Sequence, residues 1–229
     1  MQSLEIPVQL KELIQSAHHV RKMEKGSFLF QEGSVANELF IIQSGMIHVS
    51  KIVPDGRELT LRICSKGDLV GEVQLFSAET RYYLSGKVVE SGEVAVILKE
   101  ELEENLSRNH VLAMEYMKWM STHYQKTQTK VRDLVLHGKK GALFSTLIRL
   151  TNSYGSHSPK GIVLDLPLTN QELANFCGTS REVVNRLLSD LRKGDIISVD
   201  KGIITIHDLD FLKREIDCEN CTREICNID

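Results

Sequence analysis

The sequence predicts an α+β protein with an N-terminal β-roll, a long dimerisation helix, and a winged helix-turn-helix that ends in a cysteine-bearing tail. Three observations predict this fold class. Short β-type runs fill residues 23–98, an apolar pattern of helical period follows from Glu101, and two short helix patterns joined by a glycine turn lie within residues 169–193. The expected boundaries are 1–100 for the roll with an N-terminal helix, 101–137 for the long helix, 138–216 for the winged region and 217–229 for the tail.

Composition narrows the class of protein. The chain has 229 residues, of which 41% are hydrophobic and 26% charged, which is typical of a soluble globular protein. No apolar run approaches the roughly 18–20 residues that span a bilayer, and the N-terminus lacks the features of a signal peptide. We therefore expect a cytoplasmic protein without a membrane partner. Its net charge of −3 means that any binding of nucleic acid depends on a local basic patch.

The first part of the chain reads as a short amphipathic helix over residues 1–20, followed by β-runs. Gly33, Gly45, Gly56 and Gly67 separate these runs at intervals of 11 or 12 residues, the spacing of an all-β barrel or roll. Gly45 and the turn at residues 54–56 are interpreted as hairpin turns. The sequence therefore predicts a self-contained β domain.

An apolar seam marks the long helix. Ala113 starts a series of positions that alternate four and three apart, the a/d spacing of a coiled coil. The alternative is a helix that packs on its own β domain, to which Met114 and Trp119 on other faces would contribute. We favour a homodimer helix, whose predicted interface is Met117, Met120, Tyr124, Thr127, Val131 and Leu134.

Two glycines interrupt the helical pattern after this seam. Residues 137–141, His-Gly-Lys-Lys-Gly, are predicted to form a joint, and residues 142–153 return to helical period. Residues 154–160 are expected to be a polar loop.

The next stretch has the pattern of a helix-turn-helix. Thr169 with Glu172 forms a capping box, Gly178 ends the first helix, and Thr179 with Glu182 repeats the capping signal. Runs at residues 196–199 and 203–206 predict a short hairpin, the wing. An ordinary solvated helix pair is the alternative, and the wing favours DNA binding.

The second helix of this motif carries side chains that read base edges. Arg is bidentate to guanine, Glu accepts from cytosine and Asn pairs with adenine. The expected DNA-binding residues are Thr179, Ser180, Arg181, Glu182, Asn185 and Arg186.

The tail holds three of the five cysteines, Cys218, Cys221 and Cys226. Their spacing suits a metal ion or a corner of an iron–sulfur cluster, which requires a fourth ligand. Free surface thiols, a Cys218–Cys221 disulfide and structural zinc remain alternatives. Cys64 and Cys177 are expected to fill cores, and His207 on the wing stays open as a fourth ligand.

The order of these parts, the segment Gly71-Glu72-Val73-Gln74-Leu75-Phe76 and the helix start Ser-Arg-Glu-Val-Val-Asn-Arg at residues 180–186 resemble the cyclic-AMP receptor and fumarate–nitrate reduction regulator family of bacterial transcription factors. The resemblance covers essentially the whole chain. It implies a roll like a cyclic-nucleotide-binding domain and a homodimer that binds palindromic promoter DNA and works with RNA polymerase.

The resemblance also bears on what the roll binds. Nucleotide-binding members hold the cyclic phosphate with an Arg-Ser pair, where this chain has Tyr82 and Tyr83, with Arg81 one place early. Without donors at that register a phosphate site is poor, so a cyclic-nucleotide regulator is the less favoured alternative.

The C-terminal cysteines resemble those of the bacillus-type oxygen regulators of this family. That resemblance implies a [4Fe-4S] cluster on Cys218, Cys221 and Cys226, with Asp133 of the long helix as the fourth ligand. A carboxylate paired with Arg132 or Lys130 is the alternative role for Asp133. A carboxylate suits this centre less well than a thiolate, so the iron on Asp133 would be labile.

The same resemblance implies the function. Oxygen would destroy the cluster, open its link between the long helix and the DNA-binding region, and lower operator affinity, so that genes are activated anaerobically. Arg181, Glu182 and Arg186 match the base-reading positions of cyclic-AMP-receptor-like members, which predicts TGTGA-like half-sites rather than TTGAT.

Other classes fit less well. The chain has no Gly-x-Ser-x-Gly, no His-Glu-x-x-His and no phosphate-binding glycine loop, so we do not expect an enzyme. An iron–sulfur electron carrier would need neither Arg181, Glu182 and Arg186 on one helix face nor a dimer seam. A thiol-redox regulator of the same family without a cluster remains an alternative.

Overall fold

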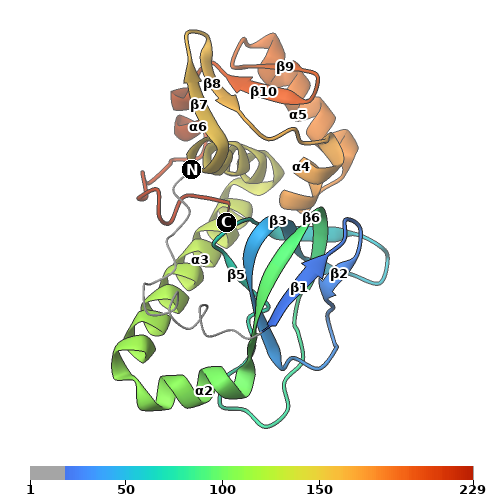
Figure 1. Ribbon diagram of the computed structural model, residues 1–229. Helices are drawn as coiled ribbons and strands as arrows, with labels where there is room; N and C mark the ends of the chain where they lie inside the picture. The colour runs from blue at the N-terminus through green and yellow to red at the C-terminus, as the bar shows by residue number, and fades with distance from the viewer. Residues whose placement is uncertain (1–18, 229) are drawn as a thin grey trace. The chain divides into compact units, whose positions relative to one another are not determined.

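The computed structural model describes residues 19–228 (Figure 1). These residues fall into two compact units, and the boundary lies between Ser121 and Thr122. Both helices and sheets are present, so the α+β class is confirmed. The predicted N-terminal helix lies outside the described residues except at His19 and Val20, which belong to a strand. None of the helices in the described part is long and apolar enough to cross a membrane.

The first unit is built on an antiparallel β-roll. Strands β6 and β3 are its centre, with β1 beside β6 and β4 beside β3, while β2 also pairs with β6 and β5 with β3. The roll predicted from the glycine spacing is therefore confirmed. Its strands are β1 (His19–Met23), β2 (Phe28–Phe30), β3 (Glu38–Ile52), β4 (Glu58–Cys64), β5 (Leu69–Val70) and β6 (Ser85–Leu98).

Gly45 does not form the predicted hairpin, because β3 continues through it. Its φ is +86°, and a Cβ there would lie 2.6 Å from the Glu90 carbonyl oxygen on β6. The glycine therefore allows a bulged strand to stay paired with its neighbour, and the pairing register shifts at this point. The turn at residues 54–56 does form, with Gly56 at φ +84°.

The core of the first unit lies inside the roll and extends under the helices that follow it. The rings of Phe30, Phe40 and Tyr82 pack together. Helix α2 (Lys99–Arg108) contributes Leu102, and the start of α3 (His110–Tyr154) contributes Trp119. Trp119 thus packs on its own β domain.

The helix predicted over residues 101–137 is two helices. Asn109, in an extended conformation, ends α2, and α3 begins at His110. Within α3, Gly138 has φ +60° and ψ −155°, which are not helical values. The predicted joint is therefore present, and it separates a first part of α3 (110–137) from a second part (139–154).

The second unit contains the winged helix-turn-helix. Helices α4 (Asn170–Phe176), α5 (Arg181–Lys193) and α6 (Leu209–Arg214) accompany a sheet in the order β7-β8-β10-β9. The wing, β9 (Ile197–Asp200) and β10 (Ile203–Ile206), is confirmed. Its turn residues Lys201 and Gly202 have φ of +47° and +84°, as a tight hairpin requires.

The expected polar loop at residues 154–160 is wrong. These residues belong largely to a hairpin of β7 (Gly155–Ser158) and β8 (Gly161–Leu164), in which Val163 pairs with Thr205 of the wing. The β-branched run after Gly161 was the signal for a strand, but its partner lies far along the chain.

Candidate functional site

Helix α5 presents one polar face and one buried face. Val184, Leu188 and Leu191 are buried, which anchors the helix in its unit. The side chains expected to read bases, Arg181, Glu182, Asn185 and Arg186, are exposed. This arrangement leaves their donors and acceptors accessible to a DNA groove.

The two helix starts of the motif differ. At α4 the predicted capping box forms, with Thr169 accepting from the Glu172 backbone and the Glu172 carboxylate accepting from the Thr169 N–H at 2.7 Å. At α5 the predicted box is wrong, because Ser180 rather than Thr179 is the N-cap, and Thr179 Oγ1 is buried without a hydrogen-bond partner.

The local geometry of α5 keeps Glu182 ionised. Hydrogen bonds from its own backbone N–H and from the Ser180 side chain lower the pKa of the Glu182 carboxyl. Glu182 is therefore an acceptor at neutral pH, the state that pairs with the amino group of cytosine.

Asn185 has a partner within the motif. The amide of Asn170, at the start of α4, donates to Asn185 Oδ1. Asn185 Oδ1 therefore already accepts one hydrogen bond, and its NH2 group stays directed to the other side, where it could donate to adenine N7 while the oxygen accepts from N6.

The tail brings its three cysteines to one cavity. The tail follows α6, a helix capped by Asp208 that was not predicted from the sequence. Cys218, Cys221 and Cys226 all line a cavity of about 470 Å³, together with Asn152, His157, Lys213, Arg223 and parts of α3 and β8. Burial raises the pKa of the Cys226 thiol, an effect that the charges of the other two thiols reinforce and the Arg149 charge opposes.

Asp133 lies at the end of the first part of α3 and is 2% exposed. One oxygen accepts from Arg132 at 2.7 Å, and the other from the Ser145 hydroxyl at 2.5 Å and from Arg149 at 3.4 Å. The pairing with Arg132 was the alternative role considered for this residue, but the carboxylate is buried rather than on the surface. Asp133 is not among the residues that line the cysteine cavity.

The donor set fits an iron–sulfur cluster in part. Three thiols on one cavity suit three corners of a cluster. Within residues 19–228, no group of three or more His, Cys, Asp or Glu side chains is arranged to hold a metal ion. If Asp133 is the fourth ligand, its carboxylate must give up at least one of its hydrogen bonds from Arg132, Ser145 and Arg149.

The other proposed ligands are engaged elsewhere. His207 Nδ1 lies 2.5 Å from the Lys160 carbonyl oxygen and its Nε2 lies 3.0 Å from Ser198 Oγ. Cys64 and Cys177 are buried, as expected of core cysteines, and burial raises the pKa of Cys177 to about 12.

Two residues that hold the tail were not predicted from the sequence. Asn152 donates to the Cys226 carbonyl oxygen at 2.6 Å, and Arg149 donates to the Ile225 carbonyl oxygen at 3.1 Å. The only sequence signal for Arg149 is a charge between the apolar residues Ile148 and Leu150, which is unusual on a buried helix face.

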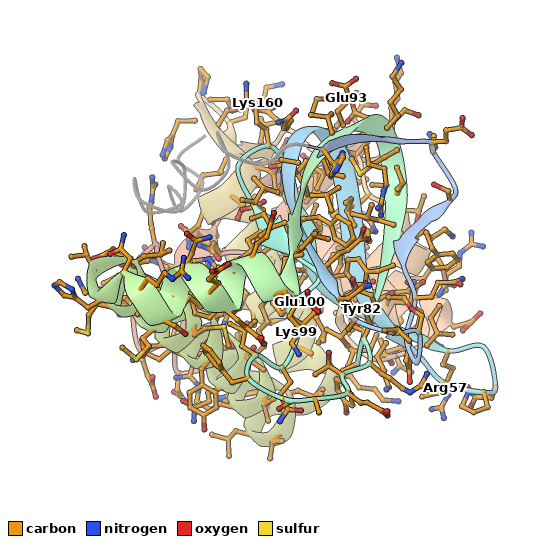
Figure 2. All side chains as sticks on the ribbon, turned by 60° about the horizontal axis from the view of Figure 1, so that its bottom comes forward. Arg57, Tyr82, Glu93, Lys99, Glu100 and Lys160 are labelled. Atoms are coloured by element: carbon orange, nitrogen blue, oxygen red, sulfur yellow. The ribbon has the colours of Figure 1, made fainter. Side chains whose placement is uncertain are left out.

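The roll places a buried phenol, Tyr82, at the position where the resemblance leads us to expect an arginine of a phosphate site. Tyr82 donates to the Glu38 carbonyl oxygen at 2.6 Å, and burial raises its pKa to about 12 (Figure 2). Tyr83 is 75% exposed and lies under the Lys51 ammonium. Glu72 pairs with the largely buried Arg62, so this carboxylate supports the roll.

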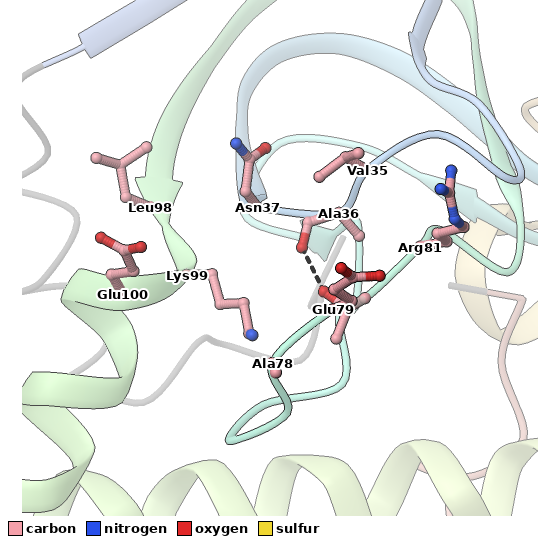
Figure 3. Close-up of a pocket in the computed structure, with 10 residues that line it drawn as sticks. Val35, Ala36, Asn37, Ala78, Glu79, Arg81, Leu98, Lys99 and Glu100 are labelled. Atoms are coloured by element: carbon pink, nitrogen blue, oxygen red, sulfur yellow. Dashed lines mark hydrogen bonds between the residues drawn. The ribbon is translucent and has the colours of Figure 1, made fainter.

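A second cavity, of about 520 Å³, opens in the same unit (Figure 3). It lies between residues 35–37, residues 78–81 and the start of α2, where Lys99 donates to the Ser77 carbonyl oxygen. Neither Glu72 nor Tyr82 is among its lining residues.

Comparison with known proteins places both units in described families. Residues 20–109 match the cyclic nucleotide-binding domain, and residues 142–215 match the Crp-like helix-turn-helix domain. The chain is 58% identical to an "Anaerobic regulatory protein" of Bacillus subtilis, over 96% of this chain and 93% of the relative. It is 26% identical to a "Global nitrogen regulator" of Synechocystis, over 82% and 84%.

Among solved structures, a CooA mutant from Carboxydothermus hydrogenoformans superposes with a TM-score of 0.78 at 20% identity. The match covers 93% of this chain and 96% of that one, and it shows a shared fold.

Proposed function

The chain belongs to the cyclic-AMP receptor and fumarate–nitrate reduction regulator family of DNA-binding transcription regulators, and we propose that it is an oxygen-responsive member whose signal is read by a [4Fe-4S] cluster. Its relatives are regulators rather than enzymes. In this proposal the chain binds palindromic promoter DNA as a homodimer when the cluster is intact, activates anaerobic genes and works with RNA polymerase.

The observation that carries the cluster proposal is the meeting of Cys218, Cys221 and Cys226 on one cavity. The anaerobic regulatory relative, which matches nearly the whole chain, supports the anaerobic role. A bound cluster supplies a centre that oxygen can oxidise. Cys218, Cys221 and Cys226 would hold the cluster as thiolates, and Asp133, which is now paired with Arg132 and Arg149, would supply a carboxylate.

An absorption spectrum with iron and sulfide counts on protein purified without oxygen tests this proposal. We expect a brown protein with about four irons per chain that bleaches in air. Asp133→Ala should make the colour markedly less stable, since it removes the fourth ligand, whereas Asp210→Ala, which removes an exposed carboxylate on α6, should not. A colourless protein, or one that holds zinc, would overturn the cluster proposal and leave a family regulator with a different signal.

We also propose TGTGA-like half-sites, and the exposure of the Arg181 side chain on α5 supports this proposal. Binding selection on the anaerobic protein should return TGTGA-like half-sites. Arg181→Val should reduce discrimination at the guanine by roughly 5- to 160-fold, because a bidentate contact is worth about 1–3 kcal/mol. Arg192→Ala removes the same charge at the other end of α5 and should weaken all sites alike. Recovery of TTGAT half-sites would contradict this assignment.

A further inference from the structure

One buried arginine joins three segments of the second unit. Arg149, on the second part of α3, is 3% exposed. Its guanidinium donates to Thr129 Oγ1 at 2.9 Å and to Asp133 Oδ2 at 3.4 Å, both on the first part of α3. The same group donates to Ser145 at 3.2 Å and to the Ile225 carbonyl oxygen of the tail at 3.1 Å.

Other side chains of α3 also contact the tail. Arg132 bridges the other Asp133 oxygen and Glu219, the residue after the first tail cysteine. Asn152 and Ser153 bond the backbone near the last cysteine, at the Cys226 carbonyl and the Ile228 N–H, the latter at 3.1 Å. The tail is thus attached to α3 at both ends by side chains other than cysteine.

These contacts make docking of the tail independent of any bound group. We propose that Arg149 is a positioning residue that keeps the cysteine tail docked beside Asp133 in the cluster-free protein. Its hydrogen bonds to Thr129, Asp133 and Ser145 hold the guanidinium between the two parts of α3, and its hydrogen bond to the Ile225 carbonyl oxygen reaches the tail.

The same residue links this inference to the cluster, and this second step rests on the proposed function. If Asp133 held the cluster, Arg149 would keep its hydrogen bonds to Thr129, Ser145 and the Ile225 carbonyl oxygen, because a buried guanidinium stays hydrogen-bonded. The tail would then stay on α3 with or without the cluster.

Hydrogen exchange on the full-length, cluster-free protein tests the docking. The protein is stripped of iron with a chelator under reducing, anaerobic conditions, and amide exchange is followed by mass spectrometry in wild type, Arg149→Gln and the milder Arg149→Lys. Arg214→Gln, an exposed arginine at the end of α6 that does not line the cysteine cavity, is the matched control. A peptide from α5, residues 181–193, reports unfolding of the unit itself.

We expect the tail amides of residues 218–228 to exchange about tenfold faster in Arg149→Gln, while residues 181–193 stay protected. Arg214→Gln should match wild type. Unchanged tail exchange in Arg149→Gln overturns the proposal. A parallel rise in the tail and in residues 181–193, in both Arg149 variants, would assign Arg149 to the fold alone and overturn it as well.

Loading the same proteins with iron and sulfide without oxygen separates the two proposals. Wild-type protein that takes up no iron would refute the cluster while the exchange result stands. Iron uptake by wild type with unchanged tail exchange in Arg149→Gln would retain the cluster and refute the role of Arg149.

Discussion

At the scale of the residue, Gly138 decides how α3 bends. Its φ of +60° with ψ of −155° is a region that side chains with a Cβ rarely enter. No atom lies within 4 Å of a Cβ built there, so a substitution would be opposed by backbone strain and not by crowding. The neighbouring Gly141 is different, since its Cβ would meet His137 Cβ at 2.1 Å.

Gly138→Ala should therefore lower the free energy of unfolding by about 1–3 kcal/mol. Urea denaturation of the iron-free wild-type and variant proteins measures this loss in the free energy of unfolding. Gly194→Ala is the control, because Gly194 has φ of −88° and its Cβ would make ordinary contacts from 3.5 Å outward. Equal stabilities of the two variants would contradict the assignment of strain to Gly138.

At the scale of the element, the first part of α3 divides its surface between two uses. Tyr116 and Trp119 pack into the roll, which was the alternative considered for this helix. The residues predicted for the dimer interface remain exposed: Met117 57%, Met120 41%, Tyr124 65%, Val131 55%, Leu134 39%, and Thr127 likewise. A contiguous apolar face of this kind supports a second copy of the helix as its partner.

Met120→Glu should raise the dimer dissociation constant at least about tenfold, because it places a charge at the centre of the seam. Gln125→Glu introduces the same charge at an exposed position off the seam and should leave association unchanged. Sedimentation equilibrium distinguishes them. If both variants remain dimeric at the same concentrations as wild type, the interface lies elsewhere.

At the scale of the whole molecule, the question is which signal reaches the DNA-binding unit. The roll matches the cyclic nucleotide-binding domain, yet Tyr82 and Tyr83 stand where the resemblance leads us to expect the Arg-Ser pair of a phosphate site, and Glu72 is paired with Arg62. We expect that millimolar cyclic AMP changes neither the melting temperature nor the operator affinity of the protein. Air should lower the affinity of the anaerobic protein. A rise in melting temperature with cyclic AMP would show binding to the folded state and contradict this prediction.

Much of the architecture was predictable because its signals are local. The capping box at Thr169, the break at Gly138 and the wing turn at Lys201-Gly202 each depend on a few neighbouring residues. The second capping box failed because Thr179 and Ser180 compete for one cap position. The hairpin of β7 and β8 was missed because its strand pairing continues to β10.

The sequence by itself determined the fold class, the order of the parts, the family and the set of cysteines brought forward as ligands. Only the tertiary structure decided what surrounds them: that Asp133 is buried between two arginines, and that Arg149 holds Ile225, 76 positions away. The reason is physical. Helix caps and turns are satisfied by groups within a few residues, whereas a buried charge must find its partners wherever the fold brings them.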